Sequence, residues 1–249
     1  MTVTEKLQTI ADNQQNVFDA GAKAEYDRFW DSFQQNGELT AYAEAFYGTA
    51  WNKRTFKPKY SMRPANAYNM FNNMNSENAY EPFDLVEHLA ALGITLDFSG
   101  VTSTGSTATG IFNSNRLFTR VGIIDLSSRT RSIDSIFNNC TELITIDKLI
   151  VSDKGVEITS NTFKSCLKLQ NLTIEGLIIS NIYLQYSPLT VDSMKSVISC
   201  LKNYAGTDEK FAYTIQFSDA CWEALEASGP SPSGGTWKEY VMFDLGWNY

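Results

Sequence analysis

The sequence predicts an α/β repeat protein, in which a short solenoid of about three to four turns lies between an N-terminal helical, coiled-coil stem and a C-terminal α+β cap. Three patterns support this prediction: segments centred on a phenylalanine recur at intervals of 25 and 26 residues, an a/d pattern opens the chain, and capped amphipathic segments close it. We expect the stem to cover residues 1–60, the solenoid residues 61–188 and the cap residues 189–249.

The stem is predicted from residues that follow one another at alternating steps of four and three over about three heptads, the spacing of a coiled-coil seam. So short a helix is marginal in isolation. A second copy of the chain would supply the missing partner face, and a trimer is the favoured homo-oligomer. The alternative is a helix that packs on its own domain. The expected oligomerisation residues are Val3, Leu7, Ile10, Gln14 and Val17.

The remainder of the stem is also predicted to be helical. Residues 26–33 carry an aromatic stripe at the spacing of one helical face, and residues 40–51 repeat the theme with Phe46 among their apolar positions. Pro58 and Pro64 then favour extended backbone in the residues before them. We expect the helical part to end there.

Three similar segments form the predicted solenoid. Each has a phenylalanine, followed six and nine residues later by further apolar residues and then by a strand-like apolar run. A period of this length suits one supersecondary unit that cannot bury its apolar face alone, so neighbouring units must stack. The segments cover residues 111–115, 136–140 and 162–166, and the expected strands follow at residues 123–126, 149–151 and 177–179.

An earlier, degraded copy of the unit is predicted to begin near Phe71 and to end at residues 96–99, which resemble residues 124–127. Its longer interval leaves room for a short amphipathic helix that starts near Pro82 and stops at Gly93. The stretch from residue 99 to residue 110 is rich in Ser, Thr and Gly, but it lacks the pattern of a phosphate loop. We expect it to be a flexible turn between units.

Stacked units place equivalent residues in interior columns. We expect the phenylalanines to form one column, the cysteines a second, and the two later apolar positions a third and a fourth, with neighbouring strands about 4.8 Å apart. The predicted ladder residues are Phe71, Phe112, Phe137, Phe163, Cys140, Cys166, Leu143, Leu169, Ile146 and Leu172.

The best-formed unit, Phe137-Asn138-Asn139-Cys140-Thr141-Glu142-Leu143-Ile144-Thr145-Ile146, resembles the leucine-rich repeats of the BspA type, which read F-x-x-C-x-x-L-x-x-I before a strand. The unit that starts at Phe163 follows the pattern nearly as well, whereas the unit of Phe112 departs from it with Asn115 and Phe118 in place of Cys and Leu. The resemblance covers about half of the chain. It implies a short leucine-rich-repeat solenoid, and it does not specify a function.

The flanks extend the resemblance. A polar helical start ahead of such repeats is similar to leucine-rich-repeat proteins encoded in prophages of gut Firmicutes, which are regarded as tail or tail-fibre-associated components. This likeness implies a virion protein made in the bacterial cytoplasm, which leaves the cell by lysis and needs no signal peptide. The polar residues 1–10 indeed lack the apolar core of a signal peptide.

The cap is predicted from helix start signals. Thr190, Ser218 and Thr236 each precede an amphipathic segment and are the expected N-caps of three short helices. Residues 212–217 are expected to form a strand, and the apolar residues 246–249 a terminal strand or a segment packed on the cap. Such a cap would hide the open end of a solenoid.

Composition argues against several function classes. The chain has a net charge of −8 and no Lys/Arg cluster, so its field repels phosphate backbones and we expect no nucleic acid partner. No apolar run reaches the length that crosses a bilayer, and we expect no membrane insertion.

We predict no catalytic, cofactor or metal site. The cysteines lack the spacing of zinc ligands and are expected to be buried thiols. His88 is the only histidine. Because it lies far in sequence from any cysteine, we expect a solvated or satisfied surface residue and no nucleophile–histidine pair.

These observations predict a non-enzymatic binding or structural protein. Its expected partner is a protein, either a tail component or a host-surface receptor, or else a surface glycan. The alternatives are a bacterial adhesion or host-interaction module, cytoplasmic or released without a classical leader, and a hydrolase of surface polysaccharide. Exposed solenoid faces bind through area and shape, so polar and aromatic residues on such a face would carry recognition.

Overall fold

A computed structural model describes residues 24, 46, 56–74, 81–101, 108–129 and 132–249. The expected oligomerisation residues Val3, Leu7, Ile10, Gln14 and Val17 lie outside the described residues, as does the aromatic stripe of residues 26–33. The coiled-coil stem and the trimer therefore stay predictions.

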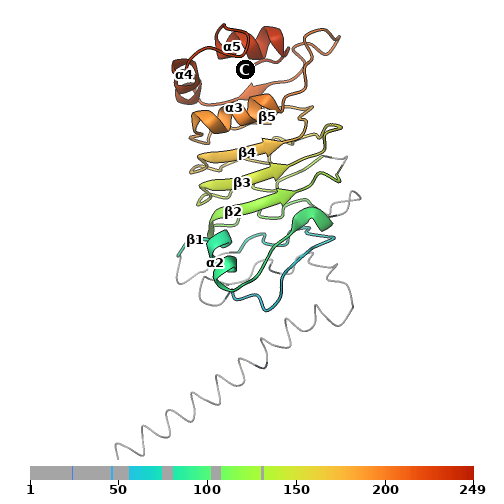
Figure 1. The fold of residues 1–249 in the computed structure, drawn as a ribbon, viewed down its shortest axis with the longest axis vertical. Coiled ribbons are helices and arrows are strands. Elements are labelled where there is room, and N and C mark those ends of the chain that lie inside the picture. The colour runs from blue at the N-terminus through green and yellow to red at the C-terminus, as the bar shows by residue number, and fades with distance from the viewer. Residues whose placement is uncertain (1–23, 25–45, 47–55, 75–80, 102–107, 130–131) are drawn as a thin grey trace, which may run out of the picture.

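A four-stranded parallel sheet runs through the middle of the molecule, and its strands lie one above another in chain order (Figure 1). Parallel neighbours in chain order require the chain to return to the same side after each strand. The register pairs Val121 with Ile146 and Ile146 with Leu172, so equivalent apolar residues stand in one column. The strands are β1 (Phe83–Asp84), β2 (Phe118–Asp125), β3 (Thr145–Ile150) and β4 (Asn171–Glu175).

A column of stacked phenylalanine rings fills the interior beside the sheet. The rings of Phe71, Phe112, Phe137 and Phe163 follow one another at centroid distances of 5.3, 5.5 and 5.7 Å, with interplanar angles of 12° or less. Each of these rings is at most 2% exposed. Near-parallel rings at this separation both bury area and favour offset stacking.

Phe46 adds a fifth ring to the column, and the sequence analysis missed it. Its ring stacks on that of Phe71 at 5.2 Å, and its backbone N–H donates to the carbonyl of Met70, as the N–H of Phe71 donates to Ile111. Phe46 lies in a turn, where we had predicted a helix. The packed stack therefore begins before residue 61, the predicted start of the solenoid. Its spacing of 25 residues from Phe71 was the available signal.

A second column consists of side chains that donate hydrogen bonds to the unit before them. The thiol of Cys140 donates to the carbonyl of Phe112 and that of Cys166 to the carbonyl of Phe137. Asn115, the departure from the repeat pattern, donates in the same way from its side-chain amide to Phe71 at 3.1 Å. The amide thus replaces the thiol because either group satisfies the buried carbonyl.

Burial keeps these thiols protonated. Desolvation raises the pKa of Cys140 well above its ordinary value and raises the pKa of Cys166 to about 12. All four cysteines, Cys140, Cys166, Cys200 and Cys221, are buried and free. Since the thiolate is the reactive form, these groups serve as donors and not as nucleophiles.

The first unit differs because a helix interrupts its strand. β1 is followed directly by α2 (Leu85–Ala91), whose N-terminus is capped by the Asp84 side chain and which ends before Gly93, a residue with φ of 67°. The chain then returns to the stack, where Leu96 bridges Met62. Residues 96–99 form this return and a 3₁₀ turn (Phe98–Gly100), so the predicted strand of this unit is instead β1. Residues 102–107 lie outside the described residues.

The strand that we predicted at residues 177–179 is wrong. β4 lies at Asn171–Glu175, in register with β3, and its residues alternate strictly between exposed and buried. The denser apolar run after it forms a separate contact, in which Ile178 bridges Val156 and Leu201. Alternation marks a half-buried strand better than apolar density does, and the sequence analysis weighed density more.

Helix α3 (Val191–Ser199) closes the edge of the sheet. Its hydroxyls of Ser193 and Ser196 accept hydrogen bonds from the backbone N–H groups of Leu172 and Ile174 in β4. An uncovered edge strand would offer these donors to another chain. The predicted cap Thr190 accepts from the N–H of Ser193.

The rest of the cap packs above α3 (Figure 1). The predicted strand of residues 212–217 is reduced to β6 (Ile215–Gln216), which pairs with β5 (Ile182–Tyr183). The end of the chain packs inward, because Trp247 is fully buried and its indole N–H donates to Lys202. The cap helices are α4 (Asp219–Ala227) and α5 (Trp237–Glu239), the latter continuing as a π-helical turn (Tyr240–Asp244).

Candidate functional site

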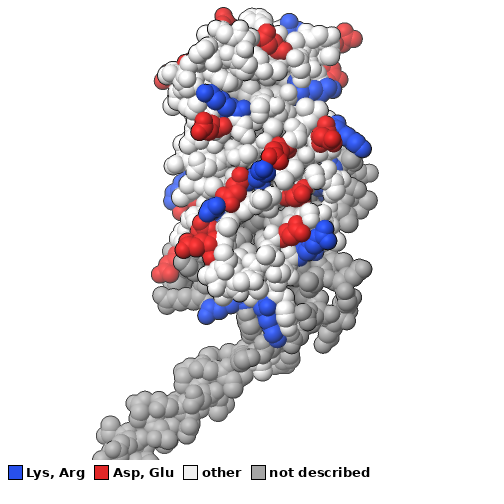
Figure 2. All heavy atoms as spheres, in the orientation of Figure 1, with Lys and Arg blue, Asp and Glu red and all other residues white. Residues whose placement is uncertain are grey.

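The outer surface of β1 to β4, which we call the sheet face, carries a diagonal strip of alternating charge (Figure 2). Arg120 forms a bidentate pair with Asp147 at 2.7 and 2.9 Å and reaches Asp84 at 3.4 Å. Further along the diagonal, Lys148 pairs with Glu175. Hydrogen bonding to Asp147 is the main cause that raises the pKa of Arg120. These charges lie on neighbouring strands and neutralise one another.

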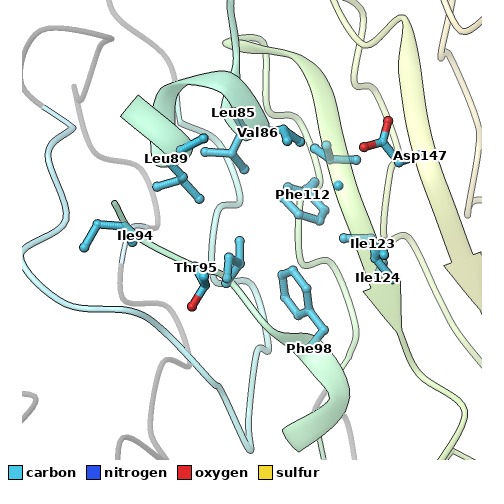
Figure 3. Close-up of a pocket in the computed structure, with 14 residues that line it drawn as sticks. Leu85, Val86, Leu89, Ile94, Thr95, Phe98, Phe112, Ile123, Ile124 and Asp147 are labelled. Carbon is cyan, nitrogen blue, oxygen red and sulfur yellow. The ribbon is translucent and has the colours of Figure 1, made fainter. Parts of the chain in front are cut away.

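An apolar pocket of about 350 Å³ opens beside this strip, between α2 and β2 (Figure 3). Helix α2 forms one wall with Leu85, Val86 and Leu89, and Phe112 of the ring column also lines the hollow. The pocket is also lined by Ile94, Thr95, Leu96, Phe98, Ile123, Ile124 and Asp147.

The pocket exists because α2 lies beside β2 instead of continuing the strand. Gly122 permits this approach, since a Cβ at this position would lie 3.4 Å from Val86 Cγ2. The neighbouring Ile123 points outward and is 54% exposed. An exposed isoleucine at the edge of an apolar hollow provides surface that a partner can bury.

His88 holds α2 in place from below. It is buried, its ring packs edge-on against Phe83 at 5.0 Å, and its Nε2 lies within hydrogen-bond distance of the Phe56 carbonyl. Because a carbonyl can only accept, Nε2 carries the proton. The expectation of a solvated surface histidine is therefore wrong, and the histidine is a buried, hydrogen-bonded one.

The structure brings the predicted ladder residues together in the interior, where they form columns behind the sheet. Leu143, Leu169, Ile146 and Leu172 are each at most 1% exposed. These residues support the surface and do not reach a ligand. The sequence analysis did not find the pocket, although an apolar residue at an outward strand position beside a glycine, Gly122-Ile123, was a visible signal.

Among the described residues, no three acidic, cysteine or histidine side chains gather as a metal-binding group. In the same part of the chain, no helix is long and apolar enough to cross a membrane. Comparisons with protein-family models, curated proteins and solved structures found no match.

Proposed function

We propose that the chain is a non-enzymatic recognition and structural protein, a short leucine-rich-repeat solenoid of the BspA type that belongs to a phage tail or tail fibre. Its sheet face would bind a protein, either another tail component or a receptor on the host surface. The observation that carries the proposal is the apolar pocket beside Ile123, on a face whose charges are already paired.

The repeat assignment is supported by three periodic features of the described residues. The rings of the phenylalanine column stack at nearly constant distance, the side chains of Asn115, Cys140 and Cys166 make the same interunit hydrogen bond, and the strands pair in parallel in chain order. In repeat proteins each unit buries its apolar face on its neighbours, and these features have that character.

The pocket favours a protein partner. Interfaces derive most of their affinity from a few apolar or aromatic anchors that fill well-packed hollows, while the polar rim sets orientation. The pocket volume accommodates such an anchor, and the charge strip beside it presents alternating signs to the approaching surface. Ile123 at the edge would be buried by the same contact.

The phage setting rests on the resemblance of the repeats and of the polar N-terminal region, and it is tested on particles. Virions purified on a density gradient from an induced lysate of a lysogenic strain that carries the gene are probed with antibodies to the protein. We expect the protein to co-sediment with the particles and to decorate tails in immunogold images. Its presence only in the soluble fraction would contradict the phage role.

The role of the sheet face is tested with two variants of equal starting exposure. Ile123 and Leu167 are both 54% exposed, but only Ile123 lies at the pocket. In the register, a glutamate at position 123 lies opposite Lys148, so Ile123→Glu should fold. We expect Ile123→Glu, and not Leu167→Glu, to weaken binding to particles that lack the protein, or to host cells, by at least about tenfold. Equal effects of the two substitutions would contradict the assignment.

The predicted stem is tested by mass photometry of the full chain and of a chain without residues 1–23. We expect a homo-oligomer for the first and a monomer for the second, since the a/d residues Val3, Leu7, Ile10, Gln14 and Val17 are removed. A strict monomer at micromolar concentration, unchanged by the deletion, would remove the oligomerisation proposal and leave the binding face untouched.

A further inference from the structure

A second hollowed surface lies on the C-terminal cap, around β5 and α4 (Figure 1). Two hollows of about 240 and about 570 Å³ adjoin there, because Gln185 and Gln216 line both. We call the two together the cap groove. It shares no lining residue with the pocket on the sheet face.

The amides in the middle of the cap groove have no partner in the protein. The side-chain oxygen of Gln185 is buried and accepts no hydrogen bond from any described residue. The side chain of Gln216, which lies opposite Tyr183 in the β5–β6 register, also makes no hydrogen bond within the part of the chain that the structure describes. A buried polar atom without a partner costs free energy, so a ligand or water that binds these amides would restore what folding leaves unmet.

Aromatic side chains stand at both ends of the cap groove. Tyr186 lines the smaller hollow and is 59% exposed, and Tyr249 lines the larger one and is 45% exposed. Tyr249 packs against Trp222 at 5.4 Å, and the Lys238 ammonium lies 5.1 Å from the Tyr249 ring centroid. The ring of Tyr249 is thus held in place before any ligand arrives, which lowers the entropy cost of binding.

We infer that the cap groove binds a saccharide, with pyranose rings stacked on Tyr186 and Tyr249 and hydroxyl groups hydrogen-bonded to Gln185 and Gln216. A pyranose has an apolar face of slightly positive C–H groups, which suits the negative face of an aromatic ring. Its adjacent hydroxyls each donate and accept. An amide side chain offers two donors and an acceptor in one plane and matches such a pair.

The composition of the cap groove separates this ligand from other classes. Lys164, Lys238 and Asp219 leave a small net charge, and Lys238 is already engaged with the rings of Trp222 and Tyr249. A polyanion would require a cluster of free cations, and an apolar protein anchor would require a hollow like that beside Ile123. An open, elongated, amide-lined groove with exposed aromatic rings at its ends fits a neutral or weakly charged oligosaccharide.

The inference is tested with the full-length chain on an array of purified bacterial cell-wall and capsular polysaccharides and host-type oligosaccharides, followed by titration calorimetry with each saccharide that binds. Tyr186→Ala and Gln216→Ala alter opposite parts of the cap groove. Phe243→Ala is the matched control, because Phe243 is an exposed aromatic residue of the cap (56%) that lines neither hollow. We expect wild type and the control to bind, and each groove variant to lose at least about tenfold in affinity.

Three outcomes would overturn the inference: no saccharide is bound by the wild-type chain, the groove variants bind as well as wild type, or Phe243→Ala loses affinity to the same extent. Circular dichroism and thermal melting confirm that each variant is folded. Ile123→Glu is included as a second control and should retain saccharide binding. Failure of the inference thus leaves the proposed role of the sheet face standing, and failure of that role leaves the inference standing.

Discussion

The sheet face and the cap groove treat their polar side chains in opposite ways. On the sheet face, Arg120 is shared between two carboxylates and Lys148 is paired, so the protein itself satisfies the charges. In the cap groove, the amides of Gln185 and Gln216 make no such contacts among the described residues. Paired charges contribute to the fold and set orientation, whereas unpaired amides contribute nothing until a ligand binds. The two surfaces therefore suit different partners.

The comparison assumes that both surfaces stand on one stack, and the largest expected effect tests this. Phe137 lies in the middle of the ring column, between Phe112 and Phe163. We expect Phe137→Ala to lower the free energy of unfolding by roughly 3–5 kcal/mol through lost burial and a cavity. Urea denaturation measures it, with Phe243→Ala as an exposed control that should change stability by less than about 0.5 kcal/mol. A small effect of Phe137→Ala would separate the two surfaces into independent units.

The second prediction concerns the buried thiols behind both surfaces. The pKa of Cys166 is raised to about 12 by burial, so the unfolded state loses this proton from about pH 9 while the folded state keeps it. Stability from this group is complete below the unfolded pKa and is lost as pH rises toward the folded value. Between pH 9 and 11 we expect wild type to lose about 2 kcal/mol more than Cys166→Ser, whose hydroxyl does not titrate. Parallel pH profiles in urea denaturation would refute this.

The charge strip of the sheet face should contribute measurably to stability. Arg120→Ala removes three hydrogen bonds and leaves Asp84 and Asp147, each about a quarter exposed, facing one another. We expect a loss of about 1 kcal/mol, and a smaller loss at high salt. Lys168→Ala, which breaks a single more exposed pair with Glu142, is the control and should cost at most about 0.5 kcal/mol. Equal costs would mean that the strip does not act as a network.

The smallest expected effect lies in the cap groove. Because the side chains of Gln216 and Tyr186 are not used within the described structure, Gln216→Ala and Tyr186→Ala should change the free energy of unfolding by less than about 0.5 kcal/mol. Denaturation curves of the two variants beside Arg120→Ala measure this contrast directly. A larger loss in the groove variants would show that these side chains stabilise the fold.

Much of the architecture could be predicted from spacing. The intervals of 25 and 26 residues correspond to rings 5.5 and 5.7 Å apart, and Thr190 and Ser218 cap the helices expected after them. The predictions that were wrong had a common cause. Phe46 was counted as helical because its neighbours are apolar, and residues 177–179 were counted as a strand because they are dense in apolar residues. Local composition was followed where periodicity gave the better answer.

The candidate surfaces were beyond prediction for a different reason. Val86 and Ile123 are far apart in sequence, and the pocket between them arises only when α2 lies beside β2. Likewise, Gln185, Gln216 and Tyr249 belong to three separate segments of the cap. No local pattern indicates that their side chains share one hollow.

The sequence by itself determined the repeating unit, its period and the residues that face inward, because burial imposes a periodic pattern that each segment shows locally. Only the tertiary structure decided where the surface is hollow and which polar groups stay unpaired. Those properties depend on the distances between side chains of different units, and such distances are set by the packing of the whole stack.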